Sequence, residues 1–141
     1  MANQMSNHFK YLLAGADINF PVHTFKIILM RSGFTFDSDN DSLYANVSND
    51  ELPTGNGYTL GGKTLTGKVV TKNDLDNYTE ITWSNISWTA SGGPIGPASG
   101  AIIYDNNPIG NPVIGFIDFG ADYTQENGGV MTLQNLEVRI S

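Results

Sequence analysis

The 141-residue sequence has no cysteine, few charged residues and no long apolar run. Without cysteine the chain can form no disulfide, no thiolate metal site and no cysteine nucleophile. Apolar runs such as "IILM" are too short to span a membrane, and the first ten residues lack the basic and apolar regions of a signal peptide. We therefore expect the chain to fold in a cytoplasm and to have no membrane partner.

Basic residues are almost absent from the second half of the chain. Up to Lys72 there are six acidic and six basic residues, whereas from Asn73 onward there are eight acidic residues and one basic residue, Arg139. The formal net charge is −7. An acidic surface repels phosphate, so the sequence predicts no nucleic-acid partner.

The composition that remains is typical of a β-rich globular protein. Apolar residues make up 40% of the chain, charged residues only 15%, and there are 16 glycines. A chain of this length can bury a core of its own, and abundant turn formers suit tightly connected strands. The sequence predicts one β-rich domain over residues 1–141.

Helical patterns are confined to the first third of the chain. In "SNHFKYLLAG", Ser6 can cap a short helix and Gly15 can end it in the left-handed conformation. Residues 1–20 are therefore predicted to form a helical arm or contact segment. A second pair of helical turns is predicted over 42–52, with Leu43 and Val47 facing inward before Pro53. Between them, residues 24–30 are apolar on both faces, which predicts a central strand.

Beyond Pro53 the apolar period changes to two, and it slips by one residue at two places. Ile81 and Trp83 share one parity, whereas Ile86 and Trp88 share the other, so the phase changes at Ser84-Asn85. A second slip falls near Asn135. Each slip predicts a bulge or tight turn that returns the apolar side to the core, with both tryptophans buried.

These patterns predict a mainly β fold: an antiparallel β-sandwich or barrel-like domain with one or two short N-terminal helices. Five or six strands are expected between residues 54 and 141, including 101–105 and 112–120. The stretch "SGGPIGPASG" at 91–100, with four glycines and two prolines, is predicted to be a loop.

Residues 57–64, "GYTLGGKT", match the phosphate-binding pattern G-x-x-x-x-G-K-T. A working phosphate loop needs a buried strand before it and a helix after it, because the helix N-terminus and the backbone N–H groups bind the phosphates. Here the preceding "NDELPTGN" is polar and broken by proline, and the following "LTGKVVTKND" has a strand period. We interpret the match as a glycine-rich turn and predict no enzymatic activity and no cofactor.

Three alternating carboxylates form the strongest metal candidate. Asp37, Asp39 and Asp41 have the spacing that hard cations such as Ca²⁺ use. An EF-hand loop starting at Asp37 would need Gly at position 42 and Glu at position 48, and both are Ser. The hypotheses are a non-EF calcium loop and, by default, a solvated acidic turn.

Several segments, taken in order and spacing, resemble a known family. They are "TFKIILMRSGFTFD", "ELPTGNGYTLGGKTLTG", "WTASGG", "GAIIYD" and "VIGFIDFG". Over roughly residues 8–140 the chain resembles small virion structural proteins of tailed bacteriophages and prophages. The resemblance brings no catalytic motif. It implies a structural role in the virion, assembled in the host cytoplasm, as a capsid decoration (cement) protein that stabilises the head.

The resemblance implies self-association, with a trimer favoured, and contacts with other virion proteins such as the major capsid protein. The alternatives are a tail or neck structural protein, or a carbohydrate- or receptor-binding module at a tail tip. Two segments are predicted to supply the contacts, the N-terminal stretch and the 91–100 loop. The interface candidates within them are Phe9, Leu12, Leu13, Phe20, Pro94, Ile95 and Pro97.

Overall fold

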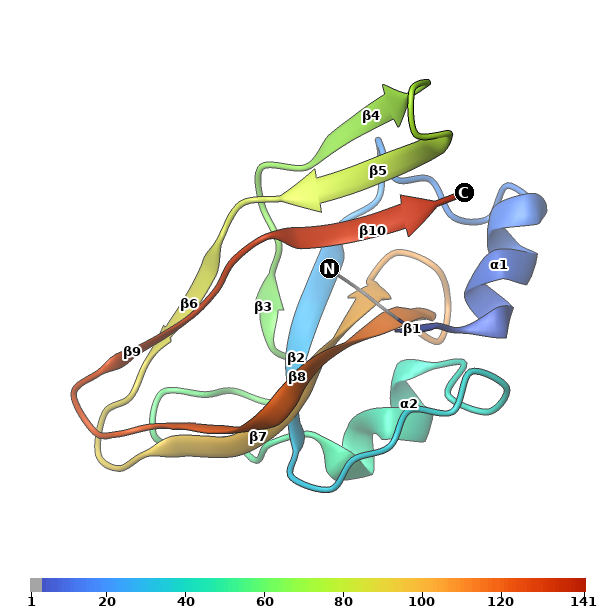
Figure 1. Cartoon of the computed structure of the whole chain (residues 1–141). Coiled ribbons are helices and arrows are strands. Elements are labelled where there is room, and N and C mark those ends of the chain that lie inside the picture. Colours follow the sequence, from blue (N-terminus) through green and yellow to red (C-terminus); the bar gives the residue numbers. More distant parts are fainter. Residues whose placement is uncertain (1–3) are drawn as a thin grey trace.

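A computed structural model describes residues 4–141 and shows a mainly β protein with short helices (Figure 1). The helical elements are α1 (Asn7–Ala14), α2 (Tyr44–Val47) and a 3₁₀ turn at Ser48–Asp50. The strands are β1 (Gln4–Met5), β2 (Phe25–Arg31), β3 (Lys63–Thr64), β4 (Val69–Asn73), β5 (Tyr78–Trp83), β6 (Ile86–Thr89), β7 (Ile95–Asp105), β8 (Val113–Gln125), β9 (Val130–Leu133) and β10 (Leu136–Ile140). All paired strands are antiparallel, as the sequence predicts.

The main sheet has the strand order β1-β8-β7-β2-β3, with β2 inside it. Ile27 and Leu29 of β2 face one apolar cluster, whereas Ile28 and Met30 face a second cluster on the other side. Because both faces of the sheet are covered, a run of apolar residues without polar alternation is stable there. The prediction of a central strand at 24–30 is confirmed.

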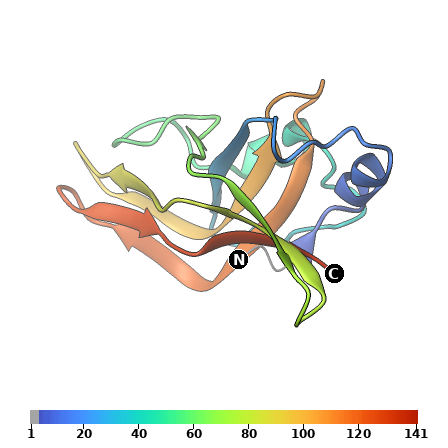
Figure 2. The same ribbon diagram turned by 90° about the horizontal axis from the view of Figure 1, so that it is seen from above.

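The second layer is a long ribbon in which β5 pairs with β10 and β6 pairs with β9 (Figure 2). Trp83 lies opposite Leu136, and Ile86 lies opposite Leu133. The two predicted phase slips therefore face each other across the ribbon. Since both strands slip at the same level, the ribbon is interrupted there and still keeps its apolar side toward the main sheet.

The core between the two layers is rich in aromatic residues. Trp83 is 6% exposed and Trp88 is 1% exposed, so the prediction that both tryptophans are buried is confirmed. Phe20 stacks on Phe25 with ring centroids 5.0 Å apart, and the Trp83 ring lies 5.7 Å from the Phe25 ring. These contacts join the N-terminal segment, the main sheet and the ribbon into one apolar cluster.

The N-terminal helix forms where the sequence predicts it but ends differently. The Ser6 hydroxyl accepts a hydrogen bond from the His8 N–H at 3.2 Å, as expected of a cap. The left-handed residue is Ala16, with φ of 66°, and not Gly15, with φ of −84°. The Gly15 N–H still reaches the carbonyl groups of the last turn, so the reversal falls one residue later.

Within the predicted arm 1–20, the described residues 4–20 pack on the core rather than forming a separable arm. Phe9 is 1% exposed and Phe20 is 5% exposed, and both belong to the cluster between the sheets. A detachable contact segment would leave such side chains available to a neighbour. Removal of residues 1–20 is therefore expected to open the core, not to leave the β domain intact.

The prediction of a loop over 91–100 is wrong for its second half, since β7 begins at Ile95 and pairs with β8 as far as Gln125. The pairing shifts between Ile95 and Ala98, and Pro97 falls within this irregularity. Proline lacks the N–H that a regular ladder requires, and an irregularity removes that requirement. Tertiary pairing thus makes a strand from a stretch whose composition indicates a loop.

The face of the main sheet away from the ribbon is covered by α2 and by the segment before it. Val47 of α2 is fully buried against this face, in agreement with its predicted inward orientation. Leu43 is only half-buried, forms a bridge with Pro112 and lies outside both apolar clusters. Among residues 4–141, no helix has the length and apolar character needed to cross a bilayer.

Candidate functional site

The segment that resembles a phosphate loop is a turn followed by a strand. Lys63 begins β3, which pairs with β2, and the Lys63 ammonium group donates to the Ser87 carbonyl and lies over the Trp88 ring. The Gly61 N–H donates to a Glu51 carboxylate oxygen at 2.9 Å. A carboxylate thus accepts a hydrogen bond that a phosphate would take in a nucleotide site, and its negative charge opposes an incoming phosphate.

Glu51 is 1% exposed, and its carboxylate is the acceptor in a buried hydrogen-bond network. The hydroxyl groups of Tyr44 and Tyr58 both donate to it, the latter at 2.6 Å. The Tyr104 hydroxyl donates to the Gly61 carbonyl at 2.8 Å. Burial, followed by the nearby Glu51 charge, raises the pKa of Tyr104 to about 12. Burial, followed by the hydrogen bond to Glu51, also raises the pKa of Tyr44 and of Tyr58. The phenols therefore remain protonated donors that hold the 51–61 segment on the sheet.

Replacing Glu51 with glutamine should destabilise the fold by about 3 kcal/mol, because the amide NH₂ would face donors that converge on one carboxylate. Urea unfolding followed by circular dichroism measures the loss. Glu126→Gln is the matched control, since Glu126 is exposed and should change the free energy of unfolding by less than about 0.5 kcal/mol. Equal stability of the two variants would contradict a structural role for the Glu51 charge.

The three aspartates of the calcium hypothesis form a turn through their own hydrogen bonds. The Asp37 carboxylate accepts from the backbone N–H of Asp39 at 2.9 Å and from the Asn40 side chain at 2.7 Å, and the latter bond lowers the pKa of Asp37. Asp41 instead accepts from the Asp37 N–H at 2.8 Å. Within residues 4–141, no group of three or more His, Asp or Glu side chains is arranged to hold a metal ion.

A histidine–aspartate pair is present that the sequence gives no signal for. Nδ1 of His23 lies 2.6 Å from Oδ2 of Asp105, and the Asp105 side chain is fully buried. The other Asp105 oxygen accepts from the Asn107 N–H at 3.0 Å, while the Thr24 N–H donates to the Asn107 side chain at 2.6 Å. These bonds fasten the start of β2 to the turn after β7. The pair therefore has a structural explanation.

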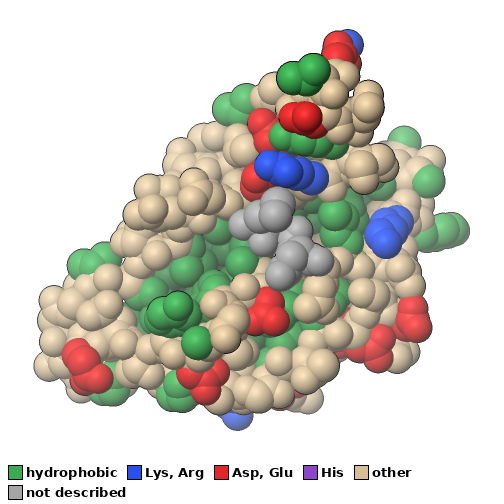
Figure 3. Space-filling model, in the orientation of Figure 1, with side chains coloured by type: hydrophobic (Ala, Val, Ile, Leu, Met, Phe, Trp, Pro, Cys, Tyr) green, Lys and Arg blue, Asp and Glu red, His purple; other side chains and the backbone are tan. Residues whose placement is uncertain are grey.

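An open apolar groove lies between β8 and β9. Figure 3 shows green apolar side chains gathered in a hollow on this face of the molecule. The groove has a volume of about 400 Å³. It is lined by Ile117, Phe119, Tyr123, Thr124, Gln125, Val130, Met131, Thr132, Leu133, Gln134 and Leu136, with no charged side chain among them. Its walls are consecutive strands that separate instead of pairing.

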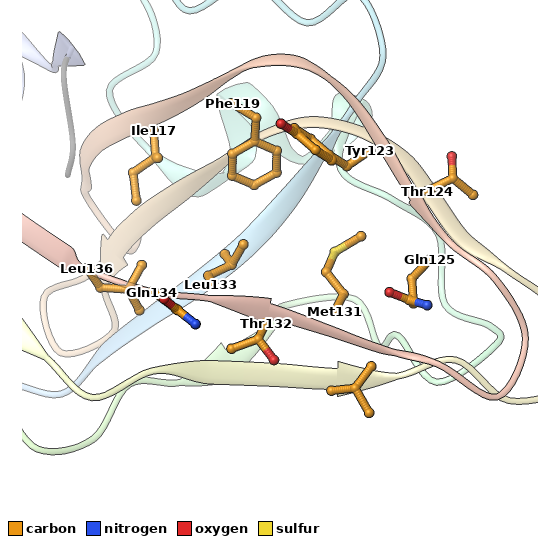
Figure 4. A pocket seen from close by; sticks show the side chains of 11 residues that line it. Ile117, Phe119, Tyr123, Thr124, Gln125, Met131, Thr132, Leu133, Gln134 and Leu136 are labelled. Atoms are coloured by element: carbon orange, nitrogen blue, oxygen red, sulfur yellow. The ribbon is translucent and has the colours of Figure 1, made fainter.

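Side chains from both walls point into the groove (Figure 4). Phe119 enters from β8, and Met131 and Leu133 enter from β9. The Phe119 and Tyr123 rings meet edge to face with centroids 5.9 Å apart. An irregularity in β8 brings them together, because β8 advances from Asp118 to Tyr123 while β7 advances only two residues. The resulting bend opens the edge of the sandwich.

The predicted interface residues lie elsewhere, and many are unavailable to a partner. Phe9, Phe20 and Ile95 are core residues. Leu12 and Leu13 are half-buried against that core, and Pro94 and Pro97 are exposed. The sequence does not predict the groove, because residues 120–129, "GADYTQENGG", have the composition of a turn. The one indication in the sequence is that Ile117, Phe119 and Tyr123 all stand at odd-numbered positions, so that in a strand they would lie on the same face.

Comparison of the chain with protein-family models, curated protein sequences and solved structures gives no significant match. The functional interpretation therefore depends on the residues and geometry described above.

Proposed function

We propose that this protein is a non-enzymatic structural component of a tailed-phage virion, a capsid decoration protein that binds copies of itself and the major capsid protein. The observation that carries the proposal is the open apolar groove between β8 and β9. A groove that exposes the edge of a sandwich without a charged side chain in its lining suits contact with another polypeptide.

The distribution of polar groups supports the same conclusion. Among residues 4–141, every buried side-chain nitrogen or oxygen atom has a hydrogen-bond partner within the protein. Glu51 and Asp105, the two buried carboxylates, are committed to holding loops on the sheet. The resemblance to virion proteins supplies the setting, and the acidic second half would keep such a protein away from packaged DNA.

Co-sedimentation with separated heads and tails of the phage that encodes this chain tests the proposal. The purified protein should sediment with heads and should raise the temperature at which heads release their DNA. Sedimentation with tails alone would replace the decoration role by the tail alternative. A protein that stays in the supernatant with both fractions would overturn the virion role.

The tail-tip carbohydrate-binding alternative has weaker support. Such modules commonly present aromatic rings on exposed loops, and Trp83 and Trp88 are buried between the layers.

A further inference from the structure

We infer that the groove receives β4 of a second copy of this chain, so that copies join head to tail. The inference concerns two features that the fold leaves open: the groove between β8 and β9, and the edge strand β4. The inference specifies the contact behind the proposed self-association. It rests on the proposed virion role only for the place where the contact acts, the surface of the particle.

β4 is an edge strand with exposed apolar side chains, and its outer side pairs with no described strand. It is the last strand of its sheet and pairs only with β5. Val69 is 54% exposed and Val70 is 45% exposed. An edge strand with adjacent exposed valines is a template for pairing with another chain, and soluble proteins usually protect such edges. On this chain the edge stays open.

The groove has the complementary character. Beyond Phe119, no strand among the described residues pairs with the outer edge of β8, and β9 pairs only with β6. Strand edges that no other described strand pairs with thus flank an apolar space. An extended segment can donate hydrogen bonds to such an edge and place alternate side chains in the groove. The β1–β8 pair shows that this edge of β8 accepts an antiparallel strand.

Charge favours β4 as the occupant. The stretch 68–72, "KVVTK", runs from the residue before β4 into β4 and has two lysines and no acid; of these, Lys68 donates to the His23 carbonyl group of its own copy, whereas Lys72 lies within β4. The stretch 119–126, which is the end of β8 and the residue after it, has Asp122 and Glu126 and no base. Lys72 pairs with Asp74 at 3.3 Å, but both side chains are more than 70% exposed. Such surface pairs contribute little stability, so Lys72 can exchange its partner for a carboxylate beside the groove.

The placement of the two features excludes a contact within one copy. The β4–β5 hairpin projects from one end of the molecule, and the turn between β8 and β9 lies at the other end (Figures 1 and 2). One copy therefore offers its hairpin to a neighbour while receiving a hairpin from another. Such a heterologous contact forms a ring when the rotation closes, and the trimer expected for this protein is one closed form.

The contact is small, because a five-residue strand covers less than the ~800 Å² per partner of a standard interface. We therefore expect weak association in solution. Sedimentation velocity over increasing concentration should show a rising average mass for the wild type. Val130→Asp in the groove and Val70→Asp in β4 should each abolish that rise. Ile109→Asp is the control, because Ile109 is fully exposed on a different turn and should associate as the wild type does.

Mixing the two defective variants gives the decisive result. Val130→Asp retains a competent β4, and Val70→Asp retains a competent groove, so the mixture should form a one-to-one complex of twice the 15.2 kDa monomer mass. Unchanged circular dichroism spectra and melting temperatures confirm that both variants are folded. A mixture that stays monomeric, or a wild type that stays monomeric throughout, would overturn the inference.

The same variants separate this contact from the virion role. If both bind heads as the wild type does and the wild type does not self-associate, the decoration role stands and the β4 contact is refuted. If the mixture forms its complex but no form of the protein binds heads or tails, the contact stands and the virion role is refuted.

Discussion

Trp88→Ala should destabilise the protein by about 3–5 kcal/mol, a large fraction of the stability of a domain of this size. The Trp88 side chain is 1% exposed, and its ring lies 5.9 Å from that of Tyr58. It also lies beneath the Lys63 ammonium group and opposite Met131 on the ribbon. Its truncation would leave a cavity where the ribbon, the 57–62 turn and the main sheet meet.

Urea unfolding followed by circular dichroism measures this loss without depending on tryptophan fluorescence. Tyr11→Ala provides the control, because the Tyr11 side chain is 74% exposed on α1 and should change stability by less than about 0.5 kcal/mol. A Trp88→Ala protein that unfolds at the same urea concentration as wild type would show that the ribbon does not pack as described.

The features predicted correctly from the sequence are those that depend on local periodicity. An apolar run without polar alternation identified β2 as a central strand, and two breaks in a period of two located the bend of the ribbon. The sequence could not show that the break at Ser84-Asn85 lies opposite the break near Asn135. That relation depends on pairing between residues about fifty positions apart, which leaves no local pattern.

The errors arose where tertiary contacts override composition. Glycine and proline indicated a loop at 91–100, but pairing with β8 makes most of it a strand. An apolar N-terminal segment looks the same in sequence whether it packs on its own domain or on a neighbour. The burial of Phe9 and Phe20 shows that this segment packs on its own domain.

The candidate site was harder to predict than the fold, because the groove is formed by strands that separate. Regular alternation marks a strand that packs well, whereas the β8 arm beyond Asp118 is bent and mostly exposed. The β4 edge gave a similarly weak signal, since two adjacent valines suit either a buried or an exposed strand. Only the arrangement of layers shows that both features remain open.

Gly62 of "GYTLGGKT" is explained by packing, and Gly62→Ala should destabilise the protein by about 4 kcal/mol. A Cβ at Gly62 would lie 1.8 Å from the Ile27 carbonyl oxygen, and φ there is +72°. That oxygen belongs to β2, against which β3 begins, so the backbone would have to move. The close approach of two strands therefore requires glycine at this position of the motif.

Gly61→Ala measures the loss of stability that comes from a strained φ alone, without a close contact between the new Cβ and a neighbouring strand. Gly61 has φ of +90°, so alanine is also strained there, but its Cβ would lie 3.8 Å from the nearest atoms, the Lys26 ammonium nitrogen and the Tyr104 hydroxyl oxygen. We expect a loss of only about 1 kcal/mol from the strained φ. Urea unfolding of both variants measures the difference of about 3 kcal/mol. If the two variants lost equal stability, the contact with Ile27 would not be the reason for glycine at position 62.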